Sequence, residues 1–79
     1  MIDKLTNGYR GRLSDLCGVL VEGPIETDDG DRWSITLLDA DAQSVGSALY
    51  FDSVDGANEA ARRVACSCGL ALVLLLAGA

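Results

Sequence analysis

The stretch that decides the fold is Gly-Leu-Ala-Leu-Val-Leu-Leu-Leu, residues 69–76, near the end of the 79-residue chain. It has no charged or polar side chain, so both faces of an extended segment here are apolar. Such a pattern is typical of strands that are covered on both faces. We therefore expect this strand to lie inside a sheet or against another subunit.

The same region raises the alternative of a membrane anchor. Residues 64–79 are uncharged, but a membrane-spanning helix needs about 20 apolar residues. The run also contains Gly69 and has no flanking cation. A buried strand is the favoured interpretation. The N-terminal residues show no secretory signal, so we expect a cytoplasmic protein with free thiols.

Residues 16–22 form the first predicted strand. Cys17, Val19 and Val21 alternate on one face, and the other face, beginning with Leu16, is apolar as well. Two apolar faces suit an interior strand.

Residues 32–39 form the second predicted strand. Trp33 and Ile35 lie on one face, and Ser34 and Thr36 lie on the other. This alternation predicts a sheet with one packed face and one face in water.

Two turns join these segments to a third predicted strand at residues 45–51. The loop at residues 23–31 contains Asp29-Gly30, a strong turn signal because glycine adopts positive φ without strain. Residues 40–44 form the second turn. The three strands should form an antiparallel meander.

One helix is predicted at residues 54–66. Asp52 or Ser53 caps its start, and Asp55 lies in its first turn, where the positive end of the helix dipole favours an acid. Gly69 ends the helical region. One stripe of the helix is small and apolar and should face the sheet: Ala57, Ala61, Val64, Ala65 and Cys68.

The strand at residues 69–76 should run parallel to the third strand after this helical crossover. The predicted fold is an α+β domain of βββαβ order: a three-stranded antiparallel meander, one helix and a C-terminal apolar strand, in a mixed sheet with the helix on one face. Residues 1–79 form a single domain, with residues 1–15 as a loosely ordered lead-in. A domain this small is marginally stable and gains from a partner or a second copy.

The net charge of −6 is distributed unevenly. Residues 22–59 contain ten acids and a single base, Arg32, so this segment has a charge of −9. The flanking segments, 1–21 and 60–79, are weakly positive. Such a field disfavours direct binding to nucleic acid or to an anionic membrane, and it favours a basic partner.

The acids of the turns and of the helix start are the candidate partner-binding residues. Apart from Arg32, the turn acids have no base near them in the sequence, and uncompensated like charges slightly destabilise a small domain. The alternative is an acidic surface that serves only solubility. The candidate set is Glu26, Asp28, Asp29, Asp31, Asp39, Asp41, Asp52 and Asp55.

The composition argues against catalysis and metal binding. Without histidine, neither a Ser-His nor a Cys-His nucleophile can be assembled, and no glycine-rich phosphate loop is present. Residues 28–31 look like a fragment of a calcium loop, but the glycine comes too early for that pattern. Cys17, Cys66 and Cys68 are one ligand short of a structural zinc site. We expect no enzyme, no cofactor and no metal.

Cys66 is the candidate for an intermolecular disulfide. The helical stripe turns Cys68 inward and Cys66 outward, so the thiol of Cys66 can meet its equivalent in a second chain. The alternative is an ordinary exposed thiol in a reducing cell.

The chain resembles the small phage-encoded anti-CRISPR proteins. Residues 44–46, Ser-Val-Gly, and 51–53, Phe-Asp-Ser, lead from a strand into a capped helix, and this arrangement occurs in similar form among them. The chain is also short, acidic and without catalytic residues, as they are. The resemblance implies a stoichiometric inhibitor of a type I Cascade complex that binds lysine- and arginine-rich surfaces meant for DNA. The alternative is an assembly subunit that associates through its apolar strand or through a disulfide.

Overall fold

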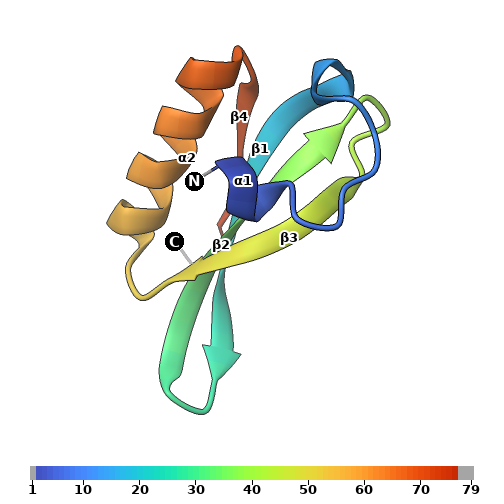
Figure 1. The fold of residues 1–79 in the computed structure, drawn as a ribbon. Helices are drawn as coiled ribbons and strands as arrows, with labels where there is room; N and C mark the ends of the chain where they lie inside the picture. Colours follow the sequence, from blue (N-terminus) through green and yellow to red (C-terminus); the bar gives the residue numbers. More distant parts are fainter. Residues whose placement is uncertain (1, 77–79) are drawn as a thin grey trace.

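The computed structural model describes residues 2–76 as a mixed four-stranded sheet with one long helix packed on it (Figure 1). The elements, in chain order, are α1 (Ile2–Leu5), the 3-10 helix η1 (Leu13–Asp15), β1 (Leu16–Thr27), β2 (Gly30–Asp39), β3 (Ser44–Phe51), α2 (Val54–Cys68) and β4 (Ala71–Leu76).

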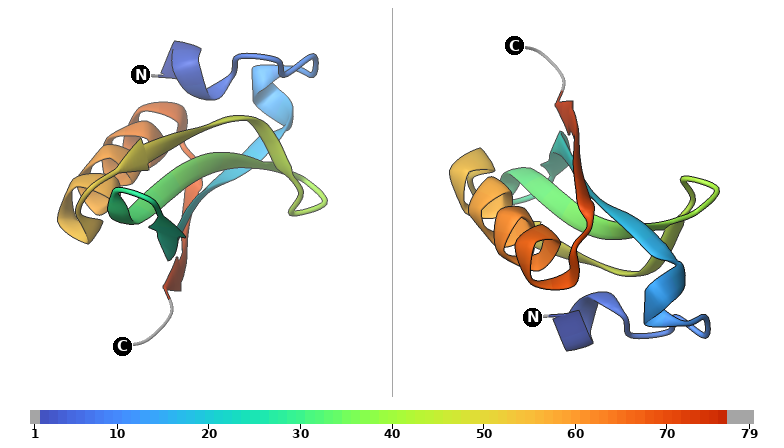
Figure 2. Two further views of the ribbon diagram at one scale, coloured as in Figure 1. Left: turned by 90° about the horizontal axis from the view of Figure 1, so that it is seen from below. Right: turned by 90° about the horizontal axis from the view of Figure 1, so that it is seen from above.

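The strand order across the sheet is β3-β2-β1-β4. β2 is antiparallel to both β1 and β3, whereas β4 is parallel to β1. The predicted α+β fold of βββαβ order is therefore confirmed. β4 runs in the same direction as β3, as expected, but it is hydrogen-bonded to β1 at the far edge of the sheet (Figure 2). The expectation that this strand lies inside the sheet was wrong.

The hydrophobic core lies between α2 and one face of the sheet. Val19 and Val21 of β1 and Ile35 and Leu37 of β2 are completely buried there. They meet a side of α2 made of small residues, which lets the helix axis approach the strands closely. The buried residues of α2 are Ala57, Ala60, Ala61, Val64 and Ala65.

The N-terminal segment is part of this core. Leu5, at the end of α1, is completely buried in the same cluster. The backbone of α1 approaches β3 so closely at Gly46 that a Cβ there would collide with the carbonyl oxygen of Leu5. The Ser47 hydroxyl also donates a hydrogen bond to the Asn7 carbonyl oxygen. The segment predicted as a lead-in at residues 1–15 therefore begins with a short helix that packs into the core.

β1 differs from its predicted form at both ends. It extends to Thr27 instead of ending near residue 22. A register shift next to Cys17 places Leu16 on the core side and leaves Cys17 exposed. The strict alternation assumed from the sequence placed these two residues on the wrong faces, because a bulge inserts one extra residue and reverses the side-chain parity beyond it.

The ends of α2 carry the expected signals. Ser53 is the N-cap, and its hydroxyl accepts a hydrogen bond from the backbone N–H of Gly56. Gly69 is the C-cap in the left-handed conformation, as predicted, and the helix itself extends to Cys68, two residues beyond its predicted end at residue 66. Cys66 is exposed as expected, but Cys68, predicted to face inward, is exposed too, because the buried part of the helix ends at Ala65.

Within residues 2–76 there is no helix whose length and hydropathy would allow it to cross a bilayer. The uncharged run that raised the question of an anchor is divided between the last turns of α2 and the whole of β4. Its residues 77–79 lie outside the described part of the chain.

Candidate functional site

The eight candidate acids lie at two opposite ends of the sheet. Six of them are at the end that contains the β1–β2 turn, at the bottom of Figure 1, and the start of α2, which lies above that turn in the same view. Asp39 and Asp41 are in the β2–β3 turn at the other end, because Asp39 pairs with the first residue of β1. The six acids that the fold brings to one end are Glu26, Asp28, Asp29, Asp31, Asp52 and Asp55.

Four of these six belong to a projecting arm, residues 25–32, which we call the acidic hairpin. A register shift between Glu22 and Ile25 separates it from the rest of the β1–β2 ladder, and three cross-strand pairs hold it together. The ribbon shows the arm extending beyond α2 and β3 (Figure 1). The arm thus presents its side chains clear of the body of the domain.

Within the acidic hairpin, Glu26 and Asp31 are directly paired across the two strands. Both side chains are exposed. Directly opposed residues in an antiparallel pair lie on the same face with their Cβ atoms about 4.5–5.5 Å apart, and like charges in that position are destabilising. The hairpin therefore keeps two carboxylates next to each other although this opposes its own folding.

The turn of the hairpin is formed by Asp28 and Asp29, both exposed. The predicted loop at residues 23–31 was too long, and the turn lies one residue earlier than the Asp29-Gly30 signal indicated. Gly30 begins β2 with φ of +112°, so it does adopt the positive φ that led to the prediction. The turn adds two further carboxylates at the tip of the arm.

The carboxylates of the hairpin have no cationic partner in the described part of the chain. Arg32, the base nearest to them in the sequence, is half-buried, and its guanidinium donates to the backbone carbonyl oxygen of Asp31. The ion pair found within residues 2–76 is elsewhere, between Arg63 and Glu59 on the surface of α2, at 2.9 Å. The charge at this end of the molecule is therefore left for water or for a partner.

Asp52 and Asp55 extend the acidic end from the hairpin to the start of α2. The end of β3 brings them there, because Phe51 pairs with Trp33 at the base of the arm. Both acids are exposed, and Asp55 lies in the first helical turn. Its charge also stabilises the helix through the helix dipole, so Asp55 has a structural role that the hairpin acids lack.

Asp39 has a structural role at the opposite end. Its carboxylate accepts hydrogen bonds from the backbone N–H groups of Asp41 and Gln43, at 2.9 and 3.0 Å, and closes the β2–β3 turn. Partial burial of Tyr9, with the charges of Asp15 and Asp39 nearby, raises the pKa of the Tyr9 hydroxyl above its ordinary value of 10.0. Asp39 and Asp41 thus lie away from the acidic end, and Asp39 also has a structural role in its own turn.

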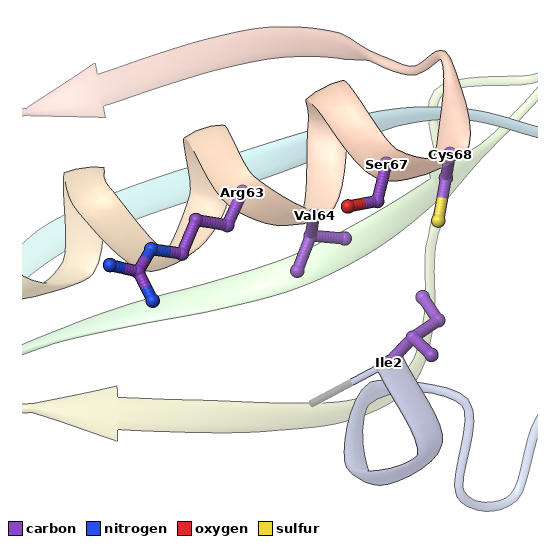
Figure 3. Close-up of a pocket in the computed structure, with 5 residues that line it drawn as sticks. All are labelled: Ile2, Arg63, Val64, Ser67 and Cys68. Carbon is purple, nitrogen blue, oxygen red and sulfur yellow. The ribbon is translucent and has the colours of Figure 1, made fainter.

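A shallow hollow between α1 and α2 contains the exposed thiol of Cys68 and the side chain of Arg63 (Figure 3). Ile2, Val64 and Ser67 complete its lining. Arg63 is already paired with Glu59, and the chain has no histidine that might activate the thiol. No set of three or more metal-ligating side chains converges anywhere in residues 2–76. The hollow therefore offers no recognisable chemistry.

The pairing of Glu26 with Asp31 was within reach of the sequence but was missed. A two-residue turn at Asp28 and Asp29 places the residues two before it and two after it opposite each other. The separation of Asp39 and Asp41 from the other acids also follows from the meander, since successive turns lie at opposite ends of a sheet.

Comparison with known proteins gave no relative: no protein-family model matches the chain, and no curated protein or solved structure matches it.

Proposed function

We propose that the protein is a non-enzymatic inhibitor that places its acidic hairpin in a basic groove meant for nucleic acid. Among such proteins it resembles the anti-CRISPR inhibitors, and the partner proposed on that basis is a type I Cascade complex. The hairpin carboxylates take the place of backbone phosphates, and the inhibitor competes with DNA for the lysine and arginine side chains of the groove.

The observation that carries this proposal is the pairing of Glu26 with Asp31 on an arm without a cationic partner in the described chain. If solubility alone were served, acids scattered over the surface would suffice, and no pair would need to be directly opposed. A cationic partner that binds between the two carboxylates relieves their repulsion, so binding is favoured by charge that the free protein leaves unbalanced.

The size of the acidic end fits a short piece of duplex. Six carboxylates equal the charge of roughly 10 Å of B-DNA, since duplex DNA carries about one charge per 1.7 Å of axis. Binding of this kind is steered by long-range attraction and weakens steeply as salt increases.

The experiment is a competition assay with purified Cascade, its guide RNA and a labelled target duplex. Wild-type protein should prevent duplex binding at low salt and should do so less well at high salt. The triple variant Asp28→Lys, Asp29→Lys, Asp31→Lys should lose about tenfold or more in inhibitory potency. The introduced lysines would face the basic side chains of the groove, and like charges placed opposite each other at an interface cost several kcal/mol.

A matched control separates a specific arm from net charge alone. The triple variant Asp3→Lys, Asp15→Lys, Asp41→Lys changes the total charge by the same amount, with all three positions outside the acidic end. It should keep most of the potency. Equal potency of the hairpin variant and wild type would overturn the role of the hairpin, and no competition by wild-type protein would overturn Cascade as the partner.

A further inference from the structure

The two edges of the sheet are built differently. The β3 edge has a register shift, with Gly46 at φ of +74° inside it, and the N-terminal segment lies against it. Bulges and covering segments are the usual means by which proteins prevent an edge strand from pairing with another chain. The β3 edge is therefore protected.

Within residues 2–76, the β4 edge has none of these protections. Its pairing with β1 runs without a register shift from Ala71 to Leu76, and it contains no proline and no charged residue. All six residues are exposed within residues 2–76. Leu74 and Leu75 keep 53% and 59% of their surface in water. A regular, apolar and uncovered edge is the form of strand that pairs readily with another strand.

Charge decides which kind of chain can approach this edge. A strongly basic partner is attracted to the acidic hairpin and not to β4, because residues 64–79 carry no charge. A second copy of this chain, although each copy has a net charge of −6, meets no acid on β4 itself. Glu22 of β1, the acid in register with β4, would lie roughly 14 Å from its equivalent across two intervening β4 strands, which is beyond the screening length of about 8 Å in physiological salt.

We propose that β4 pairs antiparallel with the β4 strand of a second copy, and that this joins the two four-stranded sheets into one continuous sheet. The two copies are related by a two-fold axis, so the same residues meet from both sides. The proposal is independent of the acidic hairpin, since that arm lies at one end of the sheet and not on the β4 edge.

The test uses one row of residues across the sheet. Tyr50, Ser34, Glu22 and Leu75 are successive partners on β3, β2, β1 and β4, so Tyr50 and Leu75 occupy opposite edges of the same row. They are similarly exposed, at 62% and 59%. Leu75→Lys places a charge on the proposed interface, and Tyr50→Lys places the same charge on the protected edge.

Molar mass is measured by light scattering across a dilution series under reducing conditions, in a Cys66→Ser background that removes the candidate disulfide. The starting protein should show about twice the chain mass of 8.2 kDa and fall towards 8.2 kDa on dilution. Leu75→Lys should stay at 8.2 kDa, and Tyr50→Lys should behave like the starting protein. Circular dichroism should show that both variants are folded.

Hydrogen exchange on the unsubstituted chain keeps the proposal testable if Leu75→Lys does not fold. Amides in residues 71–76 should exchange more slowly as concentration rises, while those of β3 should not change. A chain mass of 8.2 kDa at every concentration would overturn the proposal. A dimer that survives Leu75→Lys, or one that both substitutions abolish, would also rule out pairing through β4.

Discussion

Gly46 lies where the backbone of β3 approaches α1 closely. It has φ of +74°, and a Cβ at this position would meet the carbonyl oxygen of Leu5. Only a residue without a side chain leaves room for this approach, and the left-handed region is accessible to glycine without strain. The docking of the N-terminal segment on the sheet therefore depends on the absence of a side chain at Gly46.

Gly46→Ala should lower the free energy of unfolding by more than the cost of a left-handed alanine alone. That cost is about 1–2 kcal/mol. Gly69→Ala is the control, because Gly69 has a similar φ of +67° and open space around it. Urea unfolding of the two variants measures the difference, which reports the clash with Leu5. Equal losses in both would show that α1 can move aside freely.

Other features at the residue scale depend on geometry that a single sequence does not contain. Leu16 and Cys17 lie on the faces opposite to those predicted because of a bulge next to Gly18. Glycine inside a strand often marks a bulge, but the sequence does not show which neighbouring residue is the extra one. The cap at Ser53 and the helix end at Gly69 were predictable, because each depends on a local chemical requirement of the helix terminus.

At the scale of elements, the packing of α1 into the core was the least predictable feature of the fold. Its four residues are too few to show a helical period, and Leu5 is the one residue of α1 that is fully buried. A short helix of this kind is stabilised by packing and not by its own hydrogen bonds. Its place in the core becomes visible only once the sheet and α2 are present.

Leu5→Ala should destabilise the domain by about 2–5 kcal/mol, the range found when a buried leucine is truncated. Leu13→Ala is the control: Leu13 is 64% exposed on η1, and its truncation should change the free energy of unfolding by less than about 0.5 kcal/mol. Thermal unfolding of both variants provides the comparison. If the two losses were the same, the N-terminal segment would not contribute to the core.

The last strand shows what an apolar run can and cannot predict. Residues 69–76 correctly indicated a strand after the helix, because they are aliphatic, short and bounded by glycine. They did not identify the neighbour of that strand, since β1 and β3 run in the same direction and either could accept a parallel partner. Two apolar faces suggested an interior position, whereas the strand occupies an edge.

On the scale of the whole molecule, the charge of −6 opposes compactness. The acidic end concentrates this repulsion, with Glu26 facing Asp31 and with no described cation bound to either. High salt shortens the screening length to about 3 Å at 1 M and should remove most of the repulsion. The domain should therefore become more stable as sodium chloride is added.

The melting temperature should rise by a few degrees between low salt and about 1 M salt, since about 1 kcal/mol corresponds to about 4–8 °C in a domain of this size. The rise should be smaller in the variant Asp28→Asn, Asp29→Asn, Asp31→Asn, which lacks three of the hairpin charges. Differential scanning calorimetry provides both values. An identical rise in the variant would place the repulsion elsewhere in the molecule.

The direction of β4 has a consequence for valency. β4 is parallel to β1, and β1 leads into the acidic hairpin. When the β4 strands of two copies pair antiparallel, the two hairpins therefore lie at opposite ends of the dimer. A dimer built in this way would be a divalent tether that holds two target particles at once. Electron micrographs of the protein mixed with its target should then show pairs of target particles when one chain is present per particle. Single target particles should appear once the small protein is in large excess.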